Sequence, residues 1–434
     1  MDRHNPACKA ASLLFTSLTL WSAAAAAAPG DPLGPPFSVN LYQSDAERPG
    51  GVIASPAGFK VFWSSSNGNT GLRYFTRFDT NGARLSGDLA RTTDYGDVAS
   101  APDGRYVTTY SAYIGNHYAV LAQRYDANDI PVGPALEVTD PAAVLGPSST
   151  GTSRVAMNAS GDFIVSWVQV KLVKVLGNGC GGGFGLPRNC LNTYQTTVFA
   201  RRYAADGTPS AADTVNSGQE INAYVLDLGG DFGSQLREAA VALAHDGSFA
   251  VTWVSATEAT TYLRNAQVKL RYFPAVGNAQ LARTVEASSA SGVPEVVMDG
   301  ASNIVVAYRK HAFGNIDDVS LWLRRYAAAT GNALGAAQRI DTGMSLGQGD
   351  LLKLAATGGG AFAVGWAHAD AGIHLQRYAA DGSAVGGKLT VSGTGVYFWS
   401  LHMAAGNGRL MLAWGQSPDP FTEQDVWARV YETP

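Results

Sequence analysis

Polar and aromatic side chains follow several short apolar runs of this sequence, and their types could bind a ligand. The set consists of Arg309, Lys310, His311, His368, Asp370 and Trp399. Cations, a carboxylate and an indole at one rim would offer hydrogen bonds and a stacking surface to an acidic or neutral sugar chain. Each residue alone is also compatible with an ordinary solvated loop. The set forms a binding surface only if the fold brings its members together.

Motifs for catalysis or metal binding are weak. The one Gly-x-Ser-x-Gly segment, Gly343–Gly347, lies among strand-like runs rather than between a strand and a helix, so no nucleophile elbow is predicted. No His-Glu-x-x-His pair occurs, so no zinc site of that kind is predicted. Beyond the first 28 residues the histidines are His117, His245, His311, His368, His374 and His402. We therefore predict no metal ion and no cofactor, and we favour binding without catalysis.

Two recurring residue types are explained by structure rather than chemistry. Aspartates that directly precede a Gly are Asp103, Asp206, Asp246, Asp299 and Asp381. A calcium loop needs several oxygen ligands close together, whereas each of these segments supplies one carboxylate, so turn geometry is the better explanation. Arginines recur at Arg77, Arg124, Arg202, Arg271, Arg325, Arg377 and Arg429. A shared anion site is the alternative, but we expect them to pack on neighbouring aromatic rings or strands around the molecule.

The elements that must position these residues repeat seven times. Each unit has an apolar run that ends in an aromatic anchor, then a second run that ends in an Arg-aromatic pair or a variant of it. The anchors are Trp63, Tyr110, Trp167, Trp253, Tyr308, Trp366 and Trp414. Self-similarity at a period near 50 residues, built from strand-like runs, predicts a seven-bladed β-propeller with four antiparallel strands per blade.

One unit shows the pattern clearly. Val241–Ala244 meets a turn at His245–Gly247, and Phe249–Trp253 follows. Asp-Gly between two apolar runs is a strong hairpin signal, because Gly accepts the positive φ of such turns. The runs are apolar on both faces, as expected for a blade packed between two neighbours.

Loops that follow an anchor share one face of a propeller with the loops that lead into the innermost strands. That face would collect the candidate residues above together with Arg154, Arg237, Glu238, Glu295 and Asp350. Variable polar loops on a rigid scaffold are a usual place for binding. We expect this face to carry the ligand site.

The domain organisation follows from the repeats and the ends of the chain. Residues 37–434 form one propeller, and the segment 37–42 resembles the strand that the last unit lacks, so it should close the ring. Residues 29–36 form a Pro- and Gly-rich linker. The long interval between the third and fourth anchors contains an insertion at 168–197, and an eighth blade within 168–236 is the less favoured alternative.

The first 28 residues read as a secretory signal. Arg3 and Lys9 precede the apolar stretch Ala10–Trp21, and Ala23–Ala28 supplies small residues for cleavage. That stretch is shorter than the roughly 20 residues of a membrane span. We expect a secreted or periplasmic monomer. In such an oxidising compartment Cys180 and Cys190 should form a disulfide that restrains a Gly-rich loop, with metal binding the weaker alternative.

Charge excludes a nucleic-acid partner. The chain has 31 basic and 35 acidic residues, and removal of Asp2, Arg3 and Lys9 with the signal leaves 29 and 34, a net charge of −5. Nucleic-acid binding requires a concentrated positive surface.

The pattern Val-Ala-x-x-x-Asp-Gly-x-Phe-x-Val-x-Trp at 241–253, with Arg-Tyr-x-Ala-x-Gly at 202–207, resembles the repeats of large exported bacterial proteins that form β-propellers. The resemblance covers nearly all of 37–434, and it implies the fold and no particular activity. The sequence thus favours a secreted propeller that recognises an extracellular glycan or protein. The alternatives are a carbohydrate-active enzyme, either a polysaccharide lyase or a glycoside hydrolase, and a structural component of the cell envelope.

Overall fold

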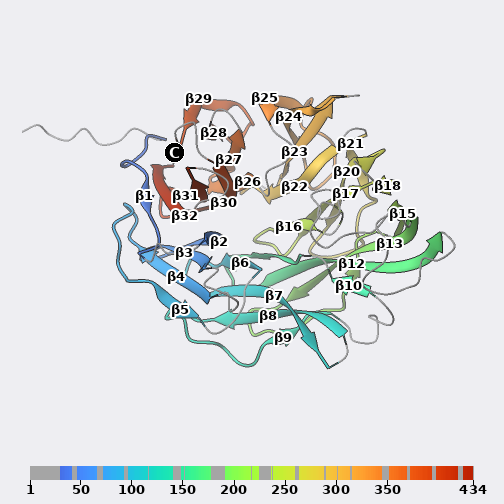
Figure 1. Ribbon diagram of the computed structural model, residues 1–434, viewed down its shortest axis with the longest axis horizontal. Coiled ribbons are helices and arrows are strands. Elements are labelled where there is room, and N and C mark those ends of the chain that lie inside the picture. The colour runs from blue at the N-terminus through green and yellow to red at the C-terminus, as the bar shows by residue number, and fades with distance from the viewer. Residues whose placement is uncertain are drawn as a thin grey trace, which may run out of the picture.

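The computed structural model describes most of the chain after residue 29. The described residues are 30–41, 46–65, 72–91, 96–115, 117–139, 148–150, 152–176, 191–216, 218–223, 236, 238–259, 263–287, 290–300, 302–312, 315–344, 351–368, 372–392, 397–418 and 424–433. They fold into seven antiparallel sheets arranged around a common centre, a seven-bladed β-propeller (Figure 1). The predicted fold class is confirmed. The described residues contain no helix long and apolar enough to cross a membrane.

The first three blades follow one another along the chain, each running from the centre outward. Blade 1 contains β2 (Glu47–Ser55), β3 (Gly58–Ser65), β4 (Leu72–Phe78) and β5 (Leu89–Arg91). Blade 2 contains β6 (Asp97–Ser100), β7 (Tyr106–Ile114), β8 (His117–Tyr125) and β9 (Leu136–Glu137). Blade 3 contains β11 (Arg154–Met157), β12 (Phe163–Leu176), β13 (Leu191–Tyr203) and β14 (Asp213–Thr214).

The last four blades keep the same order of strands. Blade 4 contains β16 (Ala239–Leu243), β17 (Phe249–Ser255), β20 (Gln267–Phe273) and β21 (Arg283–Glu286). Blade 5 contains β22 (Ala290–Met298), β23 (Ile304–Ala312), β24 (Asn315–Tyr326) and β25 (Gln338–Met344). Blade 6 contains β26 (Leu352–Gly358), β27 (Ala361–His368), β28 (Gly372–Tyr378) and β29 (Ala384–Thr390). Blade 7 contains β30 (Tyr397–Gly406), β31 (Arg409–Ser417), β32 (Asp425–Glu432) and β1 (Phe37–Ser38).

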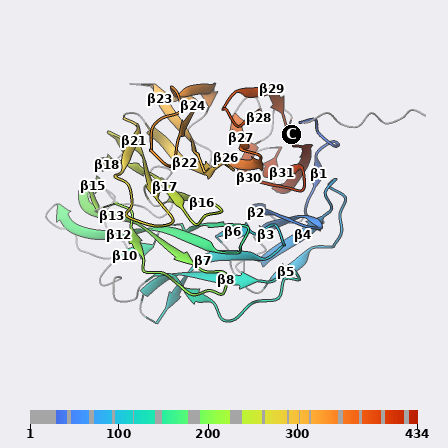
Figure 2. The same ribbon diagram turned by 180° about the vertical axis from the view of Figure 1, so that it is seen from behind.

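The N-terminal segment closes the ring as predicted. Phe37 pairs with Ala428 and Ser38 with Trp427, so β1 becomes the outer strand of blade 7. Backbone hydrogen bonds from Leu33 to Val430 at 3.0 Å extend the contact before β1. Both views of the molecule show β1 beside the last strands of the chain (Figures 1 and 2). Pairing of these ends leaves β32 without an open edge.

The described residues of the long interval before blade 4 lengthen blade 3 and form no separate sheet. Strands β12 and β13 continue beyond the blade body, and β10 (Ser148–Thr150) and β15 (Gln219–Ala223) pair with these extensions. Strand β15 then pairs in parallel with β18 (Glu258–Ala259), which forms a small hairpin with β19 (Leu263–Arg264). Blades 3 and 4 are therefore joined by sheet hydrogen bonds at this end. Cys180 and Cys190 lie outside the described residues, as does the predicted signal.

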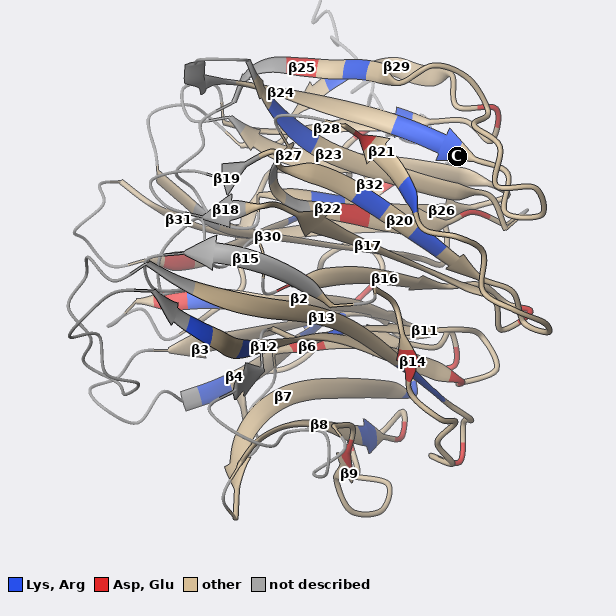
Figure 3. Cartoon of the chain, turned by 90° about the vertical axis from the view of Figure 1, so that its right-hand side faces the viewer, with Lys and Arg blue, Asp and Glu red and all other residues tan. Residues whose placement is uncertain are grey.

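Tight turns join the first and second strands of each blade. In blade 4, Asp246 Oδ1 accepts a hydrogen bond from the Ser248 backbone N–H at 2.9 Å, and Gly247 has a φ of 84°. The carboxylate fixes the turn while Gly supplies the left-handed conformation, as the sequence predicts for this aspartate. Turns gather along one edge of the molecule, where several acidic residues are drawn in red (Figure 3).

Aromatic pairs fill the blades. The first residue of the second strand stacks on the aromatic that ends the third strand: Phe163 on Tyr203 at 4.6 Å between ring centroids, and Phe249 on Phe273 at 4.3 Å. Burial of each such side chain stabilises the fold by about 1.5–3 kcal/mol. The recurrence of these positions in the sequence thus reflects packing inside and between blades.

The recurrent arginines contact neighbouring blades, as expected. Arg124 of blade 2 donates to the carbonyl of Ala205 in blade 3 at 3.0 Å, and the Arg202 guanidinium of blade 3 lies 5.2 Å from the Phe249 ring of blade 4. They are spread around the molecule and do not form one anion site.

Candidate functional site

One position of the innermost strand points into the centre in every blade. It is the residue that pairs with the position just before the aromatic anchor. The seven residues, which we call the channel ring, are Gly51, Asp97, Arg154, Ala240, Glu295, Lys353 and His402. All seven line a central cavity of about 270 Å³. Five of the seven carry an ionisable side chain, and such side chains are seldom fully buried in a protein unless they are paired.

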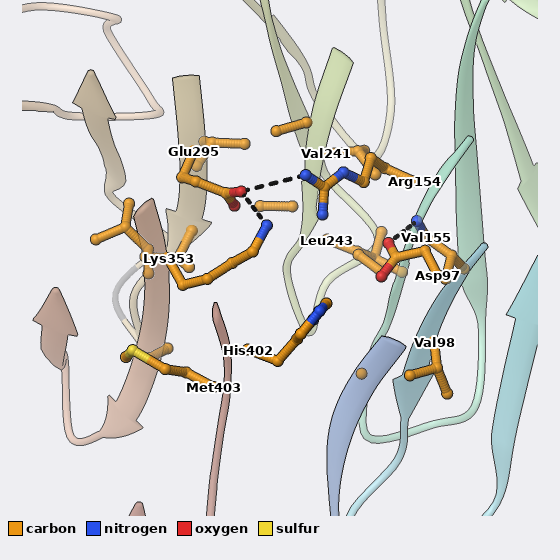
Figure 4. Close-up of a pocket in the computed structure, with 18 of the residues that line it drawn as sticks. Asp97, Val98, Arg154, Val155, Val241, Leu243, Glu295, Lys353, His402 and Met403 are labelled. Atoms are coloured by element: carbon orange, nitrogen blue, oxygen red, sulfur yellow. Dashed lines mark hydrogen bonds and ion pairs between the residues drawn. The ribbon is translucent and has the colours of Figure 1, made fainter. Parts of the chain in front are cut away.

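Ion pairs connect part of the channel ring across the cavity. Lys353 Nζ lies 2.5 Å from Glu295 Oε1, and Arg154 Nη2 lies 3.4 Å from the same oxygen (Figure 4). Arg154 also pairs through Nε with Glu238, which immediately precedes β16. Blades 3, 4, 5 and 6 are thereby linked by one network. Its four side chains are each at most 12% exposed, so bulk water screens these attractions only weakly.

Asp97 is the carboxyl of the ring that lies outside this network. Its Oδ2 accepts a hydrogen bond from the Val155 backbone N–H at 2.9 Å. Enclosure by protein raises the pKa of Asp97, because burial disfavours the charged form more than the positive charges of Arg154 and Lys353 favour it. Asp97 therefore holds its proton to a higher pH than an ordinary aspartate does.

His402 approaches the cavity from blade 7. Gly51 belongs to blade 1, which lies between blade 7 and blade 2, the blade of Asp97. The imidazole extends into the cavity (Figure 4). A Cβ at position 51 would come 2.2 Å from Val98 Cγ1, so a larger residue there would force Val98 to shift. Blade 1 therefore adds no side chain to the ring, and Val98 occupies the space beside Gly51.

The ring offers acid, base and ionic contacts but little net charge. With His402 neutral and Asp97 ionised, the two carboxylates of the ring balance Arg154 and Lys353, and the neighbouring Glu238 adds one negative charge. Among the described residues, no group of three or more His, Cys, Asp and Glu side chains could hold a metal ion.

Three predicted binding residues lie on a strand rather than in a loop. β23 continues past its anchor, so Arg309, Lys310 and His311 pair with β24. Arg309 is buried, and Lys310 Nζ lies 3.2 Å from Glu286 Oε2. Burial lowers the pKa of His311. None of the three lines the central cavity.

The other predicted residues are described only in part. His368 is the last residue of β27 and Trp399 lies on β30, and only their backbone is described. Asp370 lies outside the described residues, as do Arg237 and Asp350. The contact of Arg309, Lys310, His311, His368, Asp370 and Trp399 with a ligand stays a prediction.

Three of the residues that the sequence predicts on one face lie together in the structure. Arg154, Glu238 and Glu295 were expected on the face with the innermost-strand loops, and they do converge there. Asp97, Lys353 and His402 were missed. One signal could have found them: ring residues lie thirteen positions before the anchor in blades 2 to 6, as 97 before 110, and twelve before it in blades 1 and 7.

Comparison with solved structures supports the architecture. The polysaccharide lyase Uly1 superposes with a TM-score of 0.51 and 11% sequence identity, over 92% of each chain. A Hadza microbial sialidase, Hz136, gives a TM-score of 0.40 and 8% identity over 87% of this chain and 74% of its own. Trypanosoma rangeli sialidase gives 0.36 and 11% identity over 82% and 57%. No protein-family profile and no curated protein sequence matches this chain.

Proposed function

We propose that this protein is an exported carbohydrate-active enzyme that cleaves a polysaccharide at the central cavity. Two observations support the proposal. The fold is similar to that of a polysaccharide lyase over nearly the full length of both chains. Fold similarity at 11% identity carries no activity by itself, so the assignment depends on the chemistry of the channel ring.

The observation that carries the proposal is the presence of Asp97 and His402 in one cavity, on either side of Gly51. Cleavage of a glycosidic bond requires a group that gives a proton to the leaving oxygen and a group that takes a proton from water or from the sugar. A carboxyl with a raised pKa suits the first role, and an imidazole suits the second. We assign Asp97 as the acid and His402 as the base.

The ion-paired residues of the channel ring indicate which class of sugar would bind. Arg154 and Lys353 converge on one oxygen of Glu295, where the carboxylate of an acidic sugar would find the same two donors. In a lyase such cations stabilise the charge that develops on the sugar carboxylate when the neighbouring carbon loses its proton. An acidic polysaccharide and an elimination reaction are therefore the first choice.

A second candidate is recognition without catalysis. One observation favours it: Arg154 and Lys353 are already bonded to Glu238 and Glu295, so a ligand carboxylate must compete with groups of the protein itself. A binding module would not have to break these ion pairs, because a polysaccharide chain could lie across the mouth of the cavity.

The test is a panel of neutral and acidic polysaccharides incubated with the purified protein. Ultraviolet absorbance reports the unsaturated ends that elimination produces, and a reducing-end assay reports both elimination and hydrolysis. Asp97→Asn and His402→Ala should each lower the rate by about a hundredfold or more, the usual contribution of a general acid or base. His245→Ala changes an exposed histidine in a turn of the opposite end and should have no effect.

The outcomes separate the candidates. Ultraviolet-absorbing products identify a lyase, and reducing ends without them identify a hydrolase. Binding of a polysaccharide without either product would refute the catalytic assignment and favour recognition. Equal rates for the wild type, Asp97→Asn and His402→Ala would show that the cavity does not carry the chemistry.

A further inference from the structure

The hairpin of β7 and β8 ends in two exposed aromatic rings. Tyr113 and Tyr118 pair directly across the strands, and the pairing continues to Ile114 and His117. Their ring centroids are 5.0 Å apart and the rings are tilted by 69°. Tyr113 is 62% exposed and Tyr118 is 43% exposed. In the described part of the chain, no other pair of contacting aromatic rings has both members exposed.

This pair is held in place without being buried. The cross-strand partners fix each other's position, as neighbouring side chains on one face of a sheet do. At the hairpin end, His117 Nε2 lies 2.9 Å from Glu137 Oε1, which connects the hairpin to β9. Two large side chains thus remain in solvent on an ordered strand pair, although their burial would stabilise the fold.

The two tyrosine rings lie at the end of the propeller where the innermost strands begin. β7 runs away from the turn that joins it to β6, so its last residues reach the end where Asp97 starts β6. β7 and β8 belong to the lower part of Figure 3. Tyr113 and Tyr118 are on the same face of the hairpin as Val120, which packs with Val155 of blade 3. The pair therefore belongs to the junction of blades 2 and 3, whose ring residues are Asp97 and Arg154.

We propose that Tyr113 and Tyr118 form a stacking subsite for a sugar ring of the polysaccharide, outside the central cavity. The proposal rests on the proposed function for the class of ligand. A pyranose ring has an apolar C–H face and a hydroxylated edge, which matches two phenol rings with hydroxyl groups. The ionisable side chain at this hairpin end is His117, which is engaged with Glu137. Recognition here depends on stacking and hydrogen bonds rather than on charge.

The subsite would bind the chain while the cavity acts on a neighbouring unit. Rings fixed in advance lose little freedom on binding, so they contribute affinity efficiently. Their loss should weaken binding of a long chain and raise KM, while turnover at saturating substrate stays unchanged. This separates a positioning role from a catalytic one.

The test is electrophoresis in native gels that contain xylan, laminarin, alginate or pectate. Retardation gives an apparent Kd for the wild type, Tyr113→Ala, Tyr118→Ala and the double variant. Each single change should weaken binding roughly three- to tenfold, as expected for loss of one aromatic contact. Val276→Ala removes an exposed apolar side chain from the turn between β20 and β21 and serves as the control. Equal melting temperatures confirm that all variants are folded.

Salt and product assays complete the design. The effect of the tyrosine changes should persist in high salt, because stacking is not screened as ionic contacts are. Loss of the effect in salt would overturn the stacking assignment, as would equal retardation of wild type and double variant. No retardation of the wild type in any of the four gels would overturn it too. Tyrosine-dependent dimers in size-exclusion chromatography, with no change in retardation, would assign the pair to self-association instead.

The inference and the proposed function can fail separately. Tyrosine-dependent retardation without unsaturated or reducing ends supports the subsite and refutes catalysis. Products formed by the wild type and by the double variant with the same KM support catalysis and refute the subsite.

Discussion

Replacement of Asp129 by Asn should destabilise the junction of blades 1 and 2 markedly. Asp129 Oδ1 lies 2.5 Å from Lys60 Nζ, and Oδ2 pairs with Arg77. The Asp129 and Lys60 side chains are only 10% and 5% exposed, whereas Arg77 at 38% can turn toward water. Asn keeps the size of the side chain and tolerates the φ of 71° at this position. The change therefore removes a charge and leaves Lys60 buried without its counter-ion.

The magnitude follows from the burial of Lys60. Removal of one partner of a buried ion pair costs about 3–5 kcal/mol. With an unfolding entropy of about 2.1 cal/mol/K per residue over roughly 400 residues, that loss lowers Tm by about 4–6 °C if the propeller unfolds as one unit. Asp126→Asn is the matched control in the same turn. Asp126 Oδ1 accepts backbone hydrogen bonds from Asn128 and Ile130, which an Asn side chain can also accept.

The pH dependence gives a second readout of Asp129→Asn. Burial alone would raise the pKa of Asp129, but the hydrogen bonds from Lys60 and Arg77 outweigh it and lower that pKa below 3.8. The stabilisation is thus fully present above pH 3.8 and is lost as the pH falls through the folded-state pKa. Burial also lowers the pKa of Lys60, so the deficit of the variant should shrink as the pH rises toward 10.5. Differential scanning calorimetry from acid pH to about pH 10.5 tests both the loss at low pH and the smaller deficit at high pH. A deficit no larger than that of Asp126→Asn, or one that is constant with pH, would refute the reasoning.

Three further predictions concern the cavity, the closure and the insertion. Asp97→Asn should raise Tm at neutral pH and leave it unchanged below pH 3.8, because burial penalises the ionised carboxyl of Asp97 and not the protonated one; a lower Tm at neutral pH would contradict this. Deletion of residues 29–41 removes the strand that closes blade 7 and should lower Tm by several degrees, and an unchanged thermal transition would refute a role in stability. Mass spectrometry of the unreduced exported protein should find Cys180 joined to Cys190; two free thiols would exclude the disulfide.

The sequence predicts the blades well because each hairpin is specified locally. Asp246 and Gly247 fix a turn between apolar runs, and the same arrangement recurs in other units. Closure by the N-terminal segment was predictable for a similar reason, since the last unit lacks one strand. Local signals of this kind do not require knowledge of distant contacts.

The central site could not be predicted as easily. Asp97 and His402 are single polar residues on innermost strands more than 300 positions apart in the chain, and only ring closure brings them to one cavity. The cluster Arg309–His311 looked like a loop because it follows the anchor Tyr308, but β23 does not end there. An aromatic anchor shows where a strand packs inside its blade, but it does not show where the strand ends. The strand continues beyond the anchor as far as it pairs with the next strand.

The polarity of the channel ring is itself an argument for function. Gly51 and Ala240 show that the fold accepts small uncharged residues at this position, so packing does not demand ionisable groups there. Buried ion pairs such as Lys353 with Glu295 contribute little net stability compared with apolar side chains of similar size. A propeller selected for stability alone would fill the ring with apolar groups. The proposed cleavage of a polysaccharide requires an acid, a base and cations around one cavity, so Asp97 and His402 are the first residues to change.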